Sequence, residues 1–209
     1  MTAQGNILIQ APVPGRGACV LEFGKTTDKV TMTNPFSIGE DWIETEYYKI
    51  TFNNKGQFCS YYDKTAQREV LKEGKCANVL RVFEDKPIYY DNWDIDIFYT
   101  QKSWEVDDVQ KLEWIERGPL RAVLLVEYRF LTCFIQERIT FYAHTKQVDF
   151  VCKVDWKMSQ HLLKVFFPVD VNTSKARYDI QFGNVERPTH RNTSWDVARF
   201  EVCLLYTSN

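Results

Sequence analysis

The sequence has 209 residues, of which 44% are hydrophobic, 26% charged and 15% aromatic, so the chain is long and apolar enough to build a core. Its formal net charge is −2, and Lys and Arg gather in no basic block, which excludes a typical nucleic-acid-binding protein. The apolar stretches are too short to span a bilayer, and residues 1–10 lack the basic start and apolar core of a secretion signal, so we expect neither a membrane span nor a leader.

Residues 1–35 differ in character from the rest of the chain. Residues 10–17 contain two prolines and two glycines, and residues 26–35 are polar. We therefore predict that residues 1–35 are the end of a small preceding β-module and a linker, with a boundary near Asn34 and Pro35. Residues 36–203 are expected to form the main domain.

A β-hairpin is predicted over residues 47–62. Two strand-like runs, 47–52 and 57–62, flank the segment Asn53-Asn54-Lys55-Gly56. Asn and Gly tolerate the positive φ angles that tight hairpin turns require.

The following segments also have the length and composition of strands. Apolar and polar residues alternate over 148–156, which indicates one buried and one exposed face. Further strand-like runs separated by short turns are 111–117, 120–130, 134–142 and 162–169. We find no convincing amphipathic helix, so the sequence predicts an all-β protein, a large antiparallel two-sheet β-sandwich.

The six cysteines are not spaced as zinc ligands are in a zinc knuckle. Cys133 and Cys152 lie within strand-like runs, so we expect both to be small buried residues. A domain of this size does not need disulfides for stability. We therefore expect the cysteines to be reduced and the protein to be cytoplasmic.

The three histidines, His144, His161 and His190, are scattered along the sequence. A catalytic zinc site usually takes two of its ligands from one short segment, and no such pair is present. We predict that this chain binds no metal.

Residues 91–96 superficially resemble the start of a calcium-binding loop. That loop requires Gly at its sixth position and Glu at its twelfth, whereas Asp96 stands sixth here. Trp93 and Asp94 are therefore candidates either for an acidic, aromatic loop that meets sugar hydroxyls or an adjoining domain, or for a solvated strand edge.

Residues 182–196 are rich in polar and aromatic side chains and show no periodicity, which predicts a long polar loop. Such loops often carry binding residues, although an ordered connection is the simpler alternative. The candidates for a substrate cleft or a domain interface are Arg187, His190, Asn192, Trp195 and Asp196.

These residues also carry a family resemblance. The chain resembles the α-mannosidases of glycoside hydrolase family 38, of the bacterial and cytosolic type, over roughly residues 40–203. The segments that carry the resemblance include Glu186-Arg187-Pro188-Thr189-His190, Asn192-Thr193-Ser194-Trp195-Asp196, Trp93-Asp94-Ile95-Asp96 and Phe167-Pro168-Val169.

The resemblance implies a galactose mutarotase-like sandwich at the carboxy-terminal end of a retaining α-mannosidase that hydrolyses terminal α-mannosides. It also implies a partner, the catalytic domain, which holds the nucleophile and a divalent metal, usually zinc. No residue of this chain matches those catalytic motifs, so the chain alone is expected to be inactive. Residues 204–209 depart from the family pattern, and we expect them to be a foreign tail.

Two other functions remain open at this stage. One is a free-standing carbohydrate-binding β-sandwich module. The other is a mutarotase-like enzyme, which would need a His and a Glu facing each other across a sheet, with His144 or His190 as the base.

Overall fold

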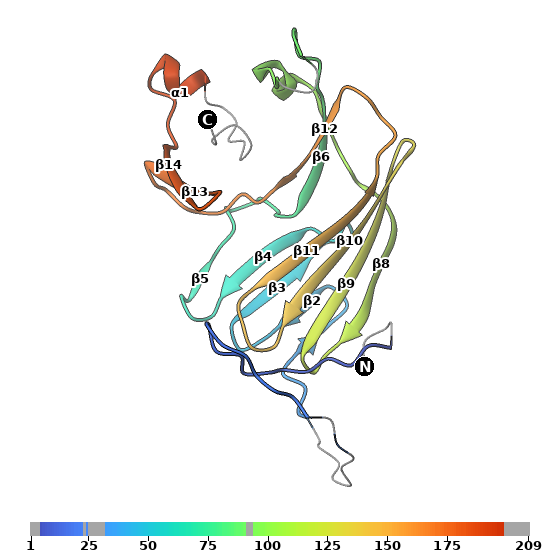
Figure 1. Cartoon of the computed structure of the whole chain (residues 1–209). Helices are drawn as coiled ribbons and strands as arrows, with labels where there is room; N and C mark the ends of the chain where they lie inside the picture. Colours follow the sequence, from blue (N-terminus) through green and yellow to red (C-terminus); the bar gives the residue numbers. More distant parts are fainter. Residues whose placement is uncertain (1–4, 23, 25–31, 91–93, 199–209) are drawn as a thin grey trace.

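The computed structural model describes residues 5–22, 24, 32–90 and 94–198, and these fold mainly into antiparallel β-sheets (Figure 1). The first sheet has five strands in the order β1-β2-β3-β4-β5. Its strands are β1 (Ser37–Ile38), β2 (Trp42–Glu44), β3 (Tyr48–Phe52), β4 (Phe58–Asp63) and β5 (Arg68–Glu69).

The second large sheet has four longer strands in the order β11-β10-β9-β8. They are β8 (Asp108–Arg117), β9 (Arg121–Phe130), β10 (Cys133–Tyr142) and β11 (Val148–Asp155). All adjacent strands pair antiparallel. The prediction of an all-β, antiparallel sandwich is confirmed.

Two smaller sheets extend the sandwich at one end. In one of them β6 lies between β12 and β7, and the other is a hairpin of β13 and β14. Their strands are β6 (Val79–Glu84), β7 (Ser103–Glu105), β12 (His161–Phe166), β13 (Lys175–Ile180) and β14 (Gly183–Pro188).

The predicted hairpin is formed by β3 and β4. Gly56 has a φ of +72°, and a Cβ at this position would lie 2.8 Å from Cγ2 of Val126 in β9. The glycine therefore serves both the turn and the close approach of the turn to the second sheet.

Aromatic side chains from the two large sheets meet in the core. The ring of Phe141 in β10 lies 6.0 Å from Phe52, 6.2 Å from Phe58 and 5.8 Å from Trp114, centroid to centroid. Phe141 is fully buried. This contact between sheets far apart in sequence is what makes the two layers one core.

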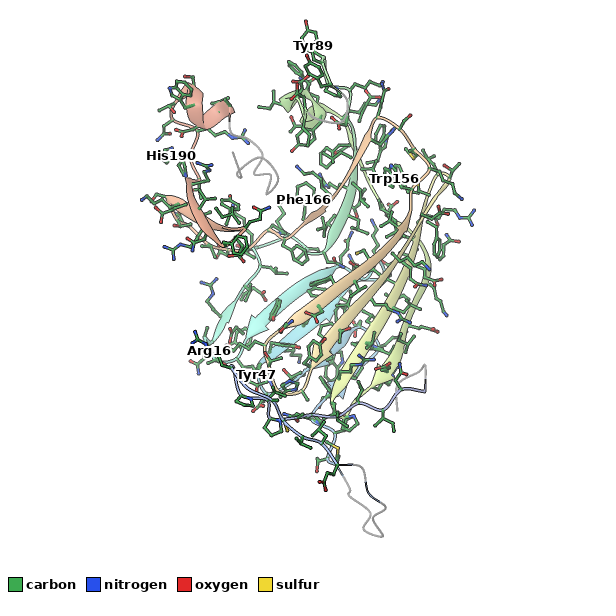
Figure 2. The ribbon with its side chains drawn as sticks, viewed as in Figure 1. Arg16, Tyr47, Tyr89, Trp156, Phe166 and His190 are labelled. Atoms are coloured by element: carbon green, nitrogen blue, oxygen red, sulfur yellow. The ribbon has the colours of Figure 1, made fainter. Side chains whose placement is uncertain are left out.

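Two projections extend from the end of the sandwich opposite the amino-terminal segment (Figure 1). We call residues 85–90 and 94–102, which include the 3-10 helix η1 (Ile97–Gln101), the Tyr89 arm. Residues 173–198, with β13, β14 and the short helix α1 (Ser194–Ala198), form the hairpin arm. Figure 2 shows Tyr89 and His190 on the two different arms.

Three sequence-based expectations are corrected by the structure. Residues 182–196 are not one long loop, because 183–188 form β14, which pairs along its whole length with β13. Residues 162–169 are not a strand throughout, because β12 ends at Phe166. Cys152 is exposed, whereas Cys133 is buried as expected. Cys152 differs because β11 is an edge strand of its sheet.

Within the described residues, no helix is long and apolar enough to cross a membrane. The described residues of 5–22 form no strand or helix. The proposed boundary near residue 35 and the foreign tail at 204–209 stay predictions.

Candidate functional site

Arg187 and His190 are brought together at the base of the hairpin arm. Arg187 lies opposite Ala176 in the β13–β14 ladder, and His190 follows two residues after the end of β14. Both line a pocket of about 240 Å³, whose other lining residues are Ser174, Lys175, Glu186 and Pro188. The pocket is therefore charged and rich in hydrogen-bonding groups.

The Lys175–Glu186 ion pair forms one wall of this pocket. Nζ of Lys175 lies 2.6 Å from Oε1 of Glu186. The hydrogen bond from Lys175, followed by its positive charge, lowers the pKa of the Glu186 carboxyl. Both side chains are largely exposed, so the pair contributes little to stability and remains available to a ligand or another domain.

Asp196 has a local structural role at the start of α1. Its carboxylate accepts hydrogen bonds from the backbone N–H and the hydroxyl of Thr193, at 3.1 and 2.8 Å, and the Thr193 hydroxyl accepts one from the Asp196 N–H at 3.2 Å. This reciprocal arrangement is a capping box. Nδ1 of His190 lies 3.5 Å from the same carboxylate, so Asp196 also links the helix to the pocket.

The other two candidates of this segment lie at the surface. Asn192 is exposed, and Trp195 has 73% of its surface exposed. Neither lines the pocket. The structure thus groups Arg187, His190 and Asp196 and leaves Asn192 and Trp195 outside that group.

A second pocket, of about 360 Å³, lies at the base of the Tyr89 arm. It is lined by Glu84, Asp85, Lys86, Asp96, Phe98, Tyr99, Gln101 and Lys102. Asp94 is exposed and is not among these residues, and Trp93 lies outside the described residues. Asp96 holds the arm together, because its carboxylate accepts a 2.7 Å hydrogen bond from the N–H of Ile88.

Glu84 is the charged centre of the second pocket. Nζ of Lys86 and Nζ of Lys102 lie 3.0 and 3.1 Å from its carboxylate, and their hydrogen bonds, Lys86 first, lower the pKa of Glu84. Sequence reasoning missed these residues because they are brought together only when β6 and the end of η1 meet. No pattern within either segment indicates this.

The two pockets have no lining residue in common. Among the residues that the structure describes, no three His, Cys, Asp or Glu side chains form a group that could hold a metal ion. His144 lies in the turn after β10, and His161 is the first residue of β12. Both pockets thus offer hydrogen bonds and charge, which suit sugar hydroxyls or polar backbone groups.

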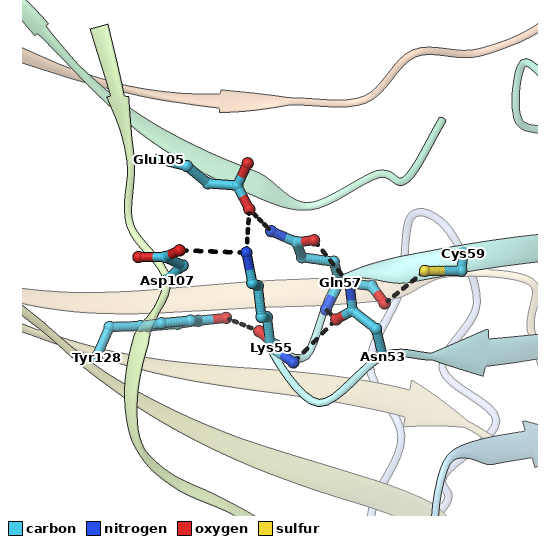
Figure 3. A network of polar contacts seen from close by, with 7 residues as sticks. All are labelled: Asn53, Lys55, Gln57, Cys59, Glu105, Asp107 and Tyr128. Atoms are coloured by element: carbon cyan, nitrogen blue, oxygen red, sulfur yellow. Dashed lines mark hydrogen bonds and ion pairs between the residues drawn. The ribbon is translucent and has the colours of Figure 1, made fainter. Parts of the chain in front are cut away.

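A polar network ties the β3–β4 turn to two other sheets (Figure 3). Oε1 of Glu105 in β7 accepts hydrogen bonds from Nζ of Lys55 at 2.9 Å and Nε2 of Gln57 at 2.8 Å. The hydroxyl of Tyr128 in β9 donates to the carbonyl of Lys55 at 2.9 Å. This network is part of the framework that positions the arms.

Residues 43–207 match the model of the glycosyl hydrolases family 38 C-terminal domain. The chain belongs to this family.

Named relatives agree with this assignment. The family 38 chain is 37% identical over 171 residues to alpha-mannosidase G of Dictyostelium discoideum, and 33% identical over 167 residues to human alpha-mannosidase 2C1. Each match covers 78% of this chain but only 16% of the relative. A Saccharomyces cerevisiae alpha-mannosidase is 33% identical over 135 residues, which are 61% of this chain and 12% of that protein. The family 38 chain therefore corresponds to a small part of these enzymes.

Proposed function

We propose that this chain is the carboxy-terminal sandwich of a retaining α-mannosidase, and that it supports a catalytic domain encoded elsewhere in the same protein. The observation that carries the proposal is the match of residues 43–207 to the C-terminal domain of family 38. The relatives are named alpha-mannosidases, and the match covers about a sixth of their length. Terminal α-mannosides are accordingly the proposed substrates of the whole protein.

Exposed apolar residues of the hairpin arm support an interface with another part of the protein. Phe182 stands at the β13–β14 turn with a φ of +59° and a fully exposed side chain. A positive φ is unfavourable for an aromatic residue, and an exposed ring contributes no burial. Contact with the catalytic domain would bury Phe182, and Trp195 of α1 is a further exposed aromatic side chain on the same arm.

A second exposed apolar stretch begins in β12 and continues towards the hairpin arm. Val165, Phe166, Phe167, Val169 and Val171 are between 40% and 60% exposed. Figure 2 shows Phe166 near the place where the two arms diverge. Exposed apolar side chains are common at interaction sites, so we assign the stretch to the same interface.

The polar pocket of Arg187 and His190 is the proposed contact with the substrate cleft. A guanidinium and an imidazole donate hydrogen bonds to hydroxyl and carbonyl oxygens, and aromatic side chains such as Trp195 suit the apolar faces of sugars. The pocket beside Asp96, with Asp94 on the same arm, is the second candidate wall, and Trp93, outside the described residues, stays a candidate from the sequence. The acidic side chains of this pocket accept hydrogen bonds from sugar hydroxyls.

The divalent metal of family 38, expected to be zinc, is assigned to the catalytic domain. The described residues of this chain offer no fitting set of ligands, since no group of three potential ligand side chains is present among them. Retaining hydrolysis also requires two carboxyl groups about 5 Å apart across the glycosidic bond. We therefore expect this chain to contribute surfaces, and not the reacting groups.

The test is to extend the reading frame upstream and to express the whole protein beside the present chain. Both are incubated with an aryl α-mannoside, with and without added zinc, and the anomeric configuration of the first product is followed by NMR. We expect turnover with retention from the whole protein only, and zinc in the whole protein only after dialysis.

Two outcomes would overturn the proposal. Turnover by the chain alone, lost on replacing one of its own carboxylates, would place the chemistry here. An upstream frame without a catalytic domain, together with mannoside binding by this chain in calorimetry, would indicate a free-standing carbohydrate-binding module.

A further inference from the structure

Phe58 of β4 and Ala77 form an isolated antiparallel bridge. The N–H of Phe58 donates to the carbonyl of Ala77 at 2.9 Å, and the N–H of Ala77 donates to the carbonyl of Phe58 at 2.8 Å. The two residues exchange both backbone hydrogen bonds, so they are a hydrogen-bonded pair. Both side chains are buried, with exposed fractions of 1% and 0%, and hence point into the core.

Antiparallel geometry places Cys59 opposite Cys76. Continuing the register of the isolated bridge by one residue makes them the adjacent pair, and such a pair is not hydrogen-bonded through the backbone. In such pairs the Cα atoms lie about 4.5 Å apart, within the range of roughly 4.4 to 6.8 Å that disulfides span. Because side chains alternate along a strand, both thiols point away from the core, and Cys59 is exposed.

The thiol of Cys59 also interacts with the thiol of Cys76. Burial of the sulfur comes first and the hydrogen bond with Cys76 second among the causes that raise the pKa of the Cys59 thiol to about 12. Figure 3 shows the Sγ of Cys59 beside the β3–β4 turn, where it lies 3.9 Å from the carbonyl of Gln57. Cys59 thus has a thiol neighbour and a fixed position.

We propose that Cys59 and Cys76 form a reversible redox site, a dithiol that closes to a cross-strand disulfide on the outer face of the first sheet. The oxidant is a small disulfide such as oxidised glutathione. A thiolate of the pair attacks one of its sulfurs and releases one glutathione thiolate. The second cysteine loses its proton to solvent and attacks the protein sulfur of the mixed disulfide. This step releases the second glutathione thiolate. Two protein thiols are oxidised and one glutathione disulfide is reduced.

The other described cysteines are not placed for this reaction. Cys133 is buried and its Sγ accepts the N–H of Lys157 at 3.2 Å, while the thiol of Cys152 lies 3.5 Å from the carboxylate of Glu137. Cys19 is exposed in the amino-terminal segment. Only the Cys59–Cys76 pair, among the described residues, has its backbone already in disulfide register.

Closing the disulfide would fasten β4 to the segment that enters β6. This segment connects the five-stranded sheet to the sheet that carries the Tyr89 arm. A cross-link of this kind restricts the unfolded chain. We therefore expect the oxidised form to melt several degrees higher than the reduced form.

To test this, the chain is equilibrated with oxidised and reduced glutathione at a series of ratios. Mass spectrometry then identifies the modification or cross-link on each cysteine. We expect a peptide pair joined through Cys59 and Cys76, with the loss of two hydrogens, which reduced glutathione reverses. The rate should rise with pH, because only the thiolate attacks. Thermal melts of the two forms are recorded in parallel.

Cys59→Ser and Cys76→Ser should each abolish the cross-link and leave the remaining cysteine carrying glutathione. Cys19→Ser is the matched control and should retain it. The proposal is overturned if the unmodified chain is found with glutathione on Cys59 and Cys76 separately and never with the two joined. This measurement uses the natural sequence, so it tests the proposal even if a serine variant fails to fold.

Discussion

The side-chain amide of Asn78 donates a 2.7 Å hydrogen bond to the carboxylate of Glu137 inside the sandwich. Each residue is only 1% exposed. The thiol of Cys152 lies 3.5 Å from the other oxygen of the same carboxylate. Burial is the main influence on Glu137 and raises its pKa, while the hydrogen bonds from Asn78 and Cys152 lower it. A carboxyl group buried inside the sandwich is a source of pH dependence.

Glu137→Gln is predicted to make the chain more stable at neutral pH than the natural sequence and less sensitive to pH. The folded-state pKa of Glu137 lies above its unfolded value. Its contribution to stability is therefore complete below the unfolded pKa, near 4.5, and is lost as pH rises through the folded pKa. Glutamine keeps the acceptor for Asn78 but cannot ionise. Thermal melts between pH 5 and 8 measure the difference, which should grow with pH.

Glu127→Gln is the control for this prediction. Glu127 is on β9, and its carboxylate accepts a 2.7 Å hydrogen bond from Gln136, so the variant makes the same change in charge on the neighbouring strand. If both variants show the same dependence of melting temperature on pH, the buried carboxylate is not the cause.

Phe141→Ala is predicted to destabilise the chain by about 3 to 5 kcal/mol, the usual cost of deleting a buried aromatic ring. Phe141 is 0% exposed and contacts aromatic rings of both large sheets. Phe182→Ala is the matched control, because that ring is fully exposed in this chain. Urea unfolding curves give both free energies, and equal losses would contradict the assignment of the core.

The sequence predicted the sandwich because alternation and turn residues are local signals. The β3–β4 hairpin and the long strands β8 to β10 follow from them directly. The hairpin of β13 and β14 was not predicted, since Gly183-Asn184-Val185-Glu186-Arg187-Pro188 has little apolar content and depends on pairing with β13. The exposure of Cys152 was missed because an alternating pattern does not show which strand will lie at the edge of a sheet.

The same limit applies to the candidate site. Arg187 and His190 were singled out by residue type, and the structure brings them together in one pocket. Asp196 was chosen for its charge, yet it caps α1. Glu84 and Lys102 were missed because they meet only through tertiary pairing of separate segments.

Leu131→Asn is predicted to stabilise the chain. Leu131 lies in the two-residue turn between β9 and β10 with a φ of +53°, and 72% of its surface is exposed. Asparagine tolerates this left-handed conformation better than leucine, and no packing is lost. We expect a gain of about 0.5 to 1 kcal/mol in urea unfolding. Leu131→Val, whose branched Cβ suits a positive φ poorly, should move stability the other way.

The last prediction concerns the hairpin arm in the whole protein. Arg187→Ala and Trp195→Ala are expected to lower kcat/KM for an aryl α-mannoside, or the melting temperature, more than His144→Ala does. His144 is the control because it lies in the turn after β10. A large aromatic or an arginine buried at an interface typically costs about 2 kcal/mol or more when truncated, which is more than tenfold in an equilibrium constant.

The two readouts separate the two proposed roles of the arm. If Arg187 contacts substrate, its variant should lose kcat/KM while the whole protein melts at its usual temperature. If Trp195 packs against the catalytic domain, its variant should lower the melting temperature of the whole protein. In the isolated chain Trp195→Ala should leave the melting temperature unchanged, because 73% of the side chain is exposed there. If all three variants keep the kcat/KM and the melting temperature of the natural protein, the arm is only a connecting segment after β12.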